Sequence, residues 1–245
     1  MDLPQIVSRE EWLVARKRLL EKEKEFSRTQ DVLSTERRAL PMVEIDKDYI
    51  FEGPQGKVRL IDMFEGREQL IVYHFMWLHD IDQGCHSCSF HVDNVPDLTH
   101  LHGAGTTLAL ISRAPLASIE RHRQRMGWTL PWYSSYGNDF NYDFHVSNDE
   151  SRFPIQYNYM DKATLEEKGL QFYTRDNGDG QGISVFVRDG ERVFNTYSTY
   201  GRGADPMLTT YNYLDLTPLG RQRHVSQMPY HDEYGQPVDH SHHHH

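Results

Sequence analysis

The two cysteines of the chain constrain its fold more than any other feature. Cys85 and Cys88 are the only cysteines among 245 residues, and two residues separate them. A strongly apolar run, residues 70–77, comes shortly before them, and the residues after Cys88 read as a helix. An apolar strand that leads into a Cys-x-x-Cys at the start of a helix predicts an α/β unit with a redox pair at the helix N-terminus.

A helix N-terminus favours an ionised thiol. The amide groups and the helix dipole stabilise negative charge there, so we expect a lowered pKa for Cys85, the predicted nucleophile. Cys88 lies one helical turn later and is the expected resolving partner in a disulfide. The imidazole of His86 can donate a hydrogen bond or carry charge, so we expect it to tune the thiolate. This hypothesis requires that solvent reaches Cys85 and that Cys88 lies within bonding reach.

Composition limits the partners and the compartment. A hydrophobic content of 38% is enough for a sizeable core, and a net charge of −10 without a basic stripe argues against nucleic acid. No apolar run is long enough to span a bilayer, and the start at Met1 lacks a signal-like segment, so we expect a cytoplasmic protein without a membrane partner. In a reducing cytosol, such a cysteine pair is more often catalytic or metal-binding than structural.

The first 45 residues predict a helical extension. Residues 8–11 have the capping-box pattern that starts a helix. Apolar residues then recur at helical spacing among many charged ones: Trp12, Leu13, Leu19, Leu20 and Phe26. The apolar stripe packs either against the domain body or against a second copy of the chain, which would make a homodimer.

Residues 46–220 predict the domain body. A hairpin is expected across residues 49–60, and the apolar strand 70–77 is followed by a helix and a second buried strand, 106–111. A helix between two strands predicts parallel pairing and a right-handed βαβ unit. A helix over 116–126 is expected to end at Gly127.

The second half of the body has a different composition. Residues 128–144, here called the aromatic segment, are dense in Trp, Tyr and Phe and predict the start of a loop-rich insertion that reaches Gly182. The dipeptide Asp189-Gly190 then predicts a hairpin between two apolar strands. A final helix near residues 211–216 is expected to pack back onto the sheet, and residues 221–245 predict a polar tail. The histidine run at its end is typical of a purification tag, so it is left out of all metal arguments.

Several sequence blocks resemble those of a known family. The blocks are Gly84 to Phe90, Ser112 to Ala117, Met126 to Trp128, Ser134 to Gly137, Asp139 to Asn141, Tyr197 to Tyr200 and Tyr211 to Pro218. They are similar to those of a thioredoxin-like family of uncharacterised microbial proteins, whose members are often labelled predicted dithiol-disulfide oxidoreductases. The resemblance covers most of the chain and implies a thioredoxin-like fold with an N-terminal helical extension and an aromatic-rich insertion. It also implies dithiol chemistry at the cysteine pair.

The chain departs from related proteins at three places. Thioredoxins have a cis-proline facing the active-site cysteines, where this chain has Gly182 or Ile183. The resembled family usually has proline after the first cysteine, where this chain has His86. Peroxiredoxins have proline and threonine seven and three residues before the reactive cysteine, where Leu78 and Asp82 stand here. An ordinary peroxiredoxin site is therefore not expected.

Three hypotheses for the cysteine pair follow. In the first, Cys85 and Cys88 exchange electrons with a small thiol, a disulfide or a protein reductant, without a cofactor. In the second, they bind zinc or copper together with nearby histidines, His91 and His79 above all, with His74 also close in sequence. In the third, the cysteines are inert and the protein is a non-catalytic binding module, in which the aromatic segment is a binding surface or core.

Overall fold

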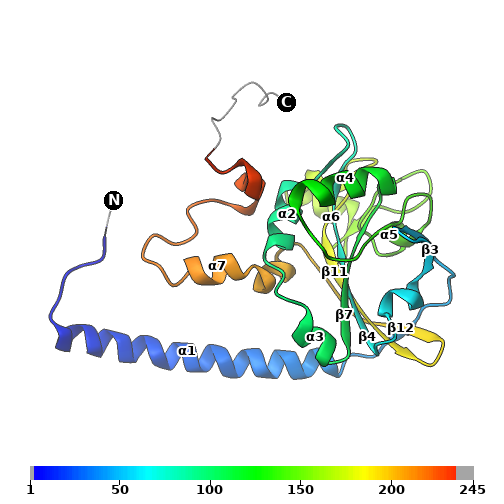
Figure 1. Cartoon of the computed structure of the whole chain (residues 1–245). Helices are drawn as coiled ribbons and strands as arrows, with labels where there is room; N and C mark the ends of the chain where they lie inside the picture. Colours follow the sequence, from blue (N-terminus) through cyan, green and yellow to red (C-terminus); the bar gives the residue numbers. More distant parts are fainter. Residues whose placement is uncertain (1–2, 236–245) are drawn as a thin grey trace.

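An eight-stranded sheet forms the centre of the structure, in the order β1-β12-β11-β4-β7-β8-β2-β3 (Figure 1). The computed structural model describes residues 3–235 of the chain. The strands of the sheet are β1 (Val43–Glu44), β2 (Ile50–Gly53), β3 (Gly56–Arg59), β4 (Gln69–His74), β7 (Thr106–Ser112), β8 (Trp132–Ser134), β11 (Gly182–Asp189) and β12 (Arg192–Tyr200). Two short hairpins lie outside it, β5 (Trp77–Leu78) with β6 (Gln83–Gly84) and β9 (Gln156–Tyr157) with β10 (Met160–Asp161).

Helices and single turns connect these strands. The α-helices are α1 (Arg9–Arg38), α2 (His86–Asp93), α3 (Thr99–Gly103), α4 (Leu116–Met126), α5 (Phe140–Asp143), α6 (Lys162–Glu167) and α7 (Thr209–Leu214). The 3-10 turns are η1 (Leu60–Phe64), η2 (Gln171–Thr174), η3 (Gly201–Met207), η4 (Val225–Gln227) and η5 (His231–Glu233).

Four central strands form the thioredoxin-like core. β4 and β7 pair in parallel, and the helices α2 and α3 lie in the connection between them. β11 pairs antiparallel with β4 on the other side, and β12 pairs antiparallel with β11. This order, a parallel pair beside an antiparallel hairpin, confirms the predicted thioredoxin-like α/β class and the predicted parallel pairing.

The two faces of the sheet bury separate apolar clusters. Because successive side chains of a strand point to opposite faces, Leu70 and Val72 of β4 lie in one cluster and Tyr73 lies in the other. Residues of η1, α5 and α6 complete the first cluster. Residues of α2 and α4 complete the second, which contains Cys85 and Cys88. The cysteine pair therefore lies on the face of the sheet that α2 and α4 cover.

Local sequence signals set the ends of several elements as predicted. The Ser8 hydroxyl accepts a hydrogen bond from the Glu11 amide (3.2 Å), and the Glu11 carboxylate accepts one from the Ser8 amide (2.9 Å), which completes the capping box of α1. Helix α4 follows Pro115 and ends at Gly127, whose φ of 65° suits glycine. The hairpin predicted at Gly190 joins β11 to β12.

The aromatic segment differs in part from its prediction. It contains β8, which joins the main sheet parallel to β7, with Tyr133 opposite Ile111. A strand of three residues is too short to show an alternating pattern in the sequence. Trp132, Phe140 and Phe144 are buried. These aromatic side chains therefore belong to the core, which was one of the two expectations for the segment.

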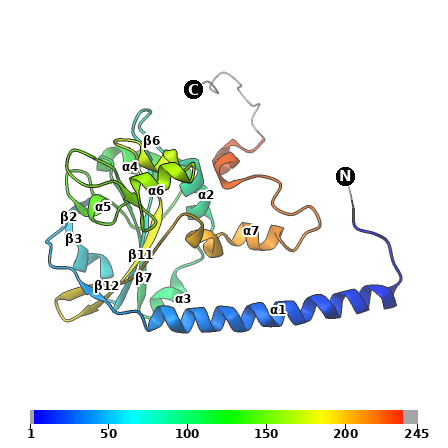
Figure 2. The same ribbon diagram turned by 180° about the vertical axis from the view of Figure 1, so that it is seen from behind.

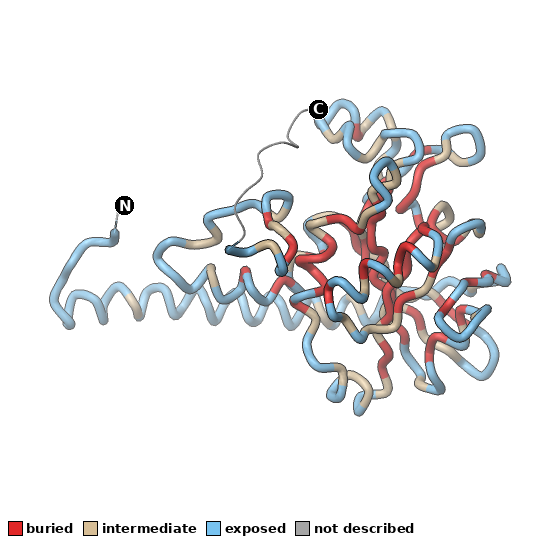
Figure 3. Tube along the Cα trace, turned by 45° about the horizontal axis from the view of Figure 1, so that its top comes forward, coloured by how far each residue is buried: buried red, intermediate tan, exposed pale blue. Residues whose placement is uncertain are grey.

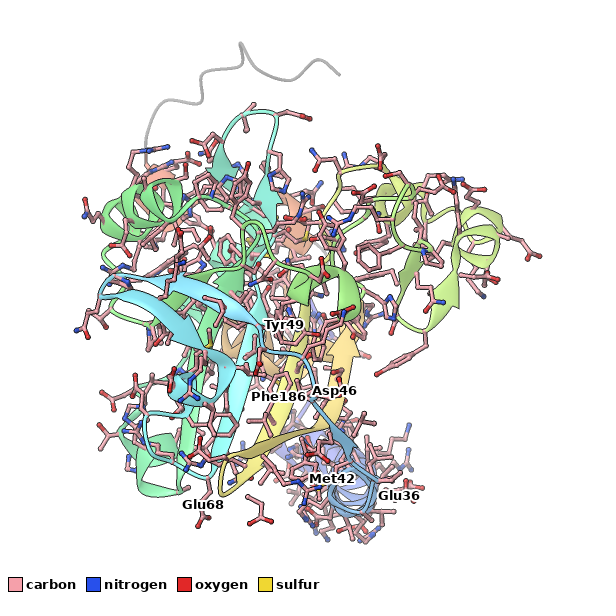
Figure 4. The ribbon with its side chains drawn as sticks, turned by 90° about the vertical axis from the view of Figure 1, so that its right-hand side faces the viewer. Glu36, Met42, Asp46, Tyr49, Glu68 and Phe186 are labelled. Carbon is pink, nitrogen blue, oxygen red and sulfur yellow. The ribbon has the colours of Figure 1, made fainter. Side chains whose placement is uncertain are left out.

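Helix α1 projects away from the domain body over most of its length (Figures 2 and 3). Figure 4 looks along the helix, with Glu36 near its end and Met42 in the chain that leads toward Tyr49 in the body. No residue of α1 is buried, and the apolar side chains of Trp12 and Phe26 are exposed. The expected packing against the domain body is thus wrong, and pairing with a second copy stays a prediction. No helix within residues 3–235, α1 included, combines the length and the apolar character needed to cross a membrane.

The C-terminal region differs most from its prediction. Tyr211 of α7 packs against Phe90 of α2, in a cluster with Met228, instead of returning to the sheet. Residues 224–234, here called the C-terminal segment, were expected in a polar tail but lie beside α2 (Figures 1 and 2) and bury the side chain of Tyr230. The histidine run expected to be a tag lies outside the described residues.

Candidate active site

Cys85 occupies the N-cap position of α2. Its backbone is extended, and His86 is the first helical residue. The amide of Cys85 donates a hydrogen bond to the Met76 carbonyl (3.2 Å), which extends the pairing of β5 with β6 up to the nucleophile. The preceding Gly84 packs so closely against α4 that a Cβ there would lie 2.7 Å from Nε2 of His122. Only glycine lets α2 begin this close to α4, and the cysteine lies at the helix N-terminus as predicted.

Hydrogen bonds stabilise the ionised form of the Cys85 sulfur. The Cys88 thiol contributes most to this, and the amides of Cys88 and Ser87 contribute further. Burial favours the protonated form, but the donors outweigh it and lower the pKa of Cys85 to about 7. A large share of this sulfur is therefore a thiolate at neutral pH.

Cys88 is the buried and protonated partner. Neither cysteine is in a disulfide. Burial raises the pKa of Cys88 well above that of an ordinary thiol, and the neighbouring Cys85 sulfur raises it further. Two donors act in the opposite direction, the Tyr73 hydroxyl and the Met76 amide, whose nitrogen lies 3.4 Å from the Cys88 sulfur. The pair thus combines a thiolate with a thiol that donates to it, which is the starting state for attack on a disulfide.

Tyr73 is a residue of the site that the sequence does not reveal. It belongs to the apolar run 70–77, where every member looks like core. In the structure it lies on β4 facing α2, where its hydroxyl donates to Cys88 and its ring stacks on His91, with 4.2 Å between the ring centroids. The sequence signal is only that Tyr73 is a polar-tipped residue in an otherwise apolar strand.

Solvent reaches the pair less than the redox hypothesis expected. Cys85 is 8% exposed and Cys88 is 0% exposed. Both sulfurs lie in an apolar cluster, and the C-terminal segment lies over the start of α2. The expectation that Cys85 is open to solvent is therefore wrong, whereas the pKa of Cys85 is lowered in the expected direction.

The C-terminal segment is held at the site by its backbone and by its side chains. The Ser87 hydroxyl donates to the Val225 carbonyl (3.4 Å). The Tyr230 hydroxyl donates to the carbonyl of Gly84, the residue that precedes the nucleophile. Met228 packs into the small apolar cluster formed by α2 and α7. A segment that looks like a tail in the sequence therefore covers the cysteine pair.

His86 lies next to the nucleophile in the chain. Its ring stacks on that of Tyr230, with 3.8 Å between the centroids and 23° between the planes. The strongest donors to the Cys85 sulfur come from Cys88 and Ser87. The role of His86 in tuning the thiolate stays a prediction, and its stacking on the C-terminal segment is a second function that the sequence did not suggest.

The histidines of the alternative metal site have other partners. Nε2 of His79 lies 3.0 Å from the Asp179 carboxylate, and His91 stacks on Tyr73. His74 is buried, and its Nε2 lies 2.8 Å from the Ser184 hydroxyl. Across the described part of the chain, no group of three or more His, Cys, Asp or Glu side chains is placed to hold a metal ion. Since structural zinc sites need four ligands, the donors expected for zinc or copper do not fit such a site here.

Two positions that distinguish related proteins have structural roles here. Ile183, at the position of the thioredoxin proline, pairs with Tyr73 across β11 and β4 and lies in the apolar cluster of the cysteines. Asp82, at the position of the peroxiredoxin threonine, accepts hydrogen bonds from the Trp77 indole (3.0 Å) and the Ser118 hydroxyl (2.9 Å). Asp82 thereby fixes the loop between β5 and β6 against α4.

A buried ion pair connects the ends of the central strands. Arg113, just after β7, donates to one carboxylate oxygen of Asp179 (2.9 and 3.1 Å), and the Ser147 hydroxyl donates to the same oxygen (2.7 Å). The other oxygen accepts from the Trp77 amide (3.1 Å) and contacts His79. Trp77 begins the hairpin that leads to Cys85, so this network holds the approach to the site. Arg113 stands in one of the family-like blocks, but nothing in the sequence indicated its partner.

The hydrogen bond from Cys88 predicts a measurable pH dependence. We expect the alkylation rate of Cys85 to rise with pH to a plateau, with a midpoint near 7. In Cys88→Ala the main donor is lost, so the midpoint should move toward the roughly 8.5 of a free cysteine. Cys88→Ser keeps a hydroxyl donor and is the matched control with the smaller shift. Identical midpoints in all three proteins, measured by mass spectrometry of the Cys85 peptide, would contradict this assignment.

Comparisons with known proteins found solved structures that are similar to this chain and one family model that matches it. The fold is similar to that of peroxiredoxin Q from Xanthomonas campestris, with 12% identity, a TM-score of 0.44, and coverage of 70% of this chain and 95% of that one. It is also similar to the peroxidoxin BcpB from Mycobacterium tuberculosis, with 11% identity, a TM-score of 0.42, and coverage of 71% and 97%. No curated protein matches the sequence significantly. The family model described as a bacterial protein of unknown function, DUF899, matches residues 1–234, and the chain therefore belongs to the DUF899 family.

Proposed function

We propose that this chain is a thiol-disulfide oxidoreductase that cycles Cys85 and Cys88 between dithiol and disulfide. The observation that carries the proposal is the asymmetry of the pair. The Cys85 sulfur is stabilised as a thiolate at the N-cap of α2, while Cys88 is held protonated one turn later and donates to it. An ionised nucleophile and an adjacent resolving thiol are the two requirements of dithiol exchange.

The reaction begins at the nucleophile. The Cys85 thiolate attacks one sulfur of a substrate disulfide, so a new sulfur–sulfur bond forms while the old one breaks. The departing substrate thiolate takes the proton of Cys88. The Cys88 thiolate then attacks the Cys85 sulfur, which releases the second substrate thiolate and leaves the Cys85–Cys88 disulfide. Two electrons pass from the protein to the substrate, and a small thiol or a protein reductant restores the dithiol by the reverse exchange.

The second step needs a negative charge on a buried sulfur. Burial opposes the ionisation of Cys88, whereas the hydrogen bonds from the Tyr73 hydroxyl and the Met76 amide favour it. The Met76 amide already donates to the Cys88 sulfur before the reaction begins (3.4 Å), so it needs no rearrangement when the proton of Cys88 leaves. We assign Tyr73 as a positioning residue that supports the resolving step.

A redox titration tests the proposal directly. Protein freed of its C-terminal histidine run is equilibrated in buffers of graded thiol–disulfide ratio, its thiols are counted, and its metal content is measured. We expect metal-free protein in which Cys85 and Cys88 lose their thiols together, in one reversible two-electron step.

Each other outcome of the titration supports a different function. Stoichiometric zinc or copper with unreactive thiols would support the metal-binding hypothesis. Metal-free protein whose thiols stay reduced across the series, or whose two thiols oxidise independently, would overturn the oxidoreductase and leave a non-catalytic binding module.

A further inference from the structure

The ring of Tyr230 occupies a slot made for an aromatic group. On one side it stacks on His86, with 3.8 Å between the ring centroids. The guanidinium of Arg125 lies 4.6 Å from its centroid, and the ring of His122 meets it at an angle of 67°. The Tyr230 hydroxyl donates to the Gly84 carbonyl. Stacking, a cation–π contact and one acceptor at the far end together recognise a planar ring that carries a hydrogen-bond donor.

The slot lies at the nucleophile. Gly84, which accepts from the hydroxyl, directly precedes Cys85, and His86, which stacks on the ring, directly follows it. Burial raises the pKa of Tyr230, and the charge of the Cys85 thiolate raises it further, as expected for neighbouring groups. Tyr230 is 1% exposed, so its neighbours cover the side chain almost entirely. A disulfide cannot approach Cys85 along this side while Tyr230 remains.

Val225 and Met228 pack against the small apolar cluster of α2 and α7, and the other contacts of the C-terminal segment lie at the surface. Arg125 donates to the carboxylates of Asp232 (2.8 Å) and Glu233 (3.0 Å), and His231 lies 2.8 Å from Asp93. These pairs are partly exposed, and surface ion pairs contribute little to stability. The segment also forms no strand and lies on no sheet. Besides this small cluster, only the Tyr230 ring is buried, so the segment can open locally while the rest of the fold stays intact.

We infer that the Tyr230 slot is the substrate site of this protein, and that it receives the aromatic side chain of a polypeptide whose disulfide Cys85 attacks. The inference rests on the proposed function. Tyr230 is an internal stand-in for that side chain, and the C-terminal segment must leave before the reaction. The present occupant is itself a polypeptide, and the site binds its backbone as well as its ring, because the Ser87 hydroxyl donates to the Val225 carbonyl. The Gly84 carbonyl favours tyrosine over phenylalanine, since only tyrosine has a hydroxyl to donate.

Alkylation of Cys85 tests the slot without any substrate turnover. In Tyr230→Ala we expect iodoacetamide to react with Cys85 at least about tenfold faster than in the unmodified protein, because local opening is no longer required. Tyr213→Ala, an exposed tyrosine of α7 outside the C-terminal segment, is the matched control and should react at the original rate. Adding N-acetyltyrosinamide to Tyr230→Ala should slow the reaction again, N-acetylphenylalaninamide should slow it less, and N-acetylleucinamide should leave it unchanged.

The opposite results would overturn the inference. An unchanged alkylation rate in Tyr230→Ala would show that Tyr230 does not block Cys85. Equal protection by the leucine and tyrosine compounds, or protection by neither, would show that the slot does not select aromatic rings. Tyr230→Phe is the control for misfolding of the alanine variant. It keeps the ring, so its Cys85 should react only slightly faster than that of the unmodified protein. Alkylation needs only a thiolate, so these results do not depend on the outcome of the redox titration. A failed titration would overturn the proposed oxidoreductase function, but it would not contradict the aromatic slot.

Discussion

Replacing Cys85 with serine should abolish disulfide exchange. The serine hydroxyl is not ionised at neutral pH, so the donors from Cys88 and Ser87 have no thiolate to stabilise. We expect the rate of reduction of a small aromatic disulfide by the dithiol protein to fall by roughly a thousandfold or more, the scale on which enzymes lose activity with their nucleophile. The measurement follows release of the chromophoric thiol under single-turnover conditions.

Cys88→Ser is the matched variant, because it removes the other thiol and keeps the nucleophile. It should attack the disulfide and then stop, so that a stable mixed disulfide at Cys85 accumulates and is visible by mass spectrometry. The two variants should also unfold at the temperature of the original protein, since serine nearly matches cysteine in size. Full activity in Cys85→Ser, or a mixed disulfide at residue 88 in the original protein, would reverse the roles assigned to the two sulfurs.

The sequence predicts those features of the site that depend on residues close to one another in the chain. The capping box at Ser8, the end of α4 at Gly127 and the position of Cys85 at the start of α2 all depend on residues within one helical turn. The same holds for the lowered pKa of Cys85, because the groups that lower it belong to Ser87 and Cys88, two and three residues later. Such contacts need no knowledge of the rest of the fold.

Contacts between distant segments could not be predicted in the same way. The hydrogen bond from Tyr230 to Gly84 joins residues 146 positions apart, and nothing near Tyr230 in the sequence resembles a strand or a long helix. The region after Gly220 is rich in polar residues, and the two side chains that are buried between residues 221 and 235, Met228 and Tyr230, give no periodic pattern. For this reason the sequence predicted an exposed nucleophile, whereas the structure shows a covered one.

The exposure of α1 shows a second limit of prediction from the sequence. An apolar stripe containing Trp12 and Phe26 predicts a buried helix face. The structure leaves both side chains exposed. Periodicity identifies the face that packs, but it does not say whether the partner is the same chain. Pairing of the apolar stripe of α1 with a second copy of the chain therefore remains a prediction.

Replacing Asp179 with alanine should be the most destabilising change near the site. Its carboxylate is buried and accepts hydrogen bonds from Arg113, Ser147 and the Trp77 amide. Removing it leaves the Arg113 guanidinium buried without a counter-ion. Loss of one partner of a buried ion pair costs about 3–5 kcal/mol, and we expect the free energy of unfolding by urea to fall by that amount. Asp139→Ala is the matched control, because that carboxylate pairs with Arg152 at the surface and should matter by less than about 1 kcal/mol.

The pH dependence of the stability lost in Asp179→Ala identifies the cause of that loss. Burial raises the pKa of Asp179, but the hydrogen bond from His79 and the charge of Arg113 outweigh it and hold the pKa below its ordinary 3.8. A carboxyl whose pKa is lowered by folding stabilises the native state above its unfolded pKa and loses that contribution as the pH falls through the folded value. The stability gap between the original protein and Asp179→Ala should therefore be widest near neutral pH and narrow below about pH 4. A gap that is constant with pH would mean that packing around residue 179, and not its charge, holds β4 and β7 to the loop before β11.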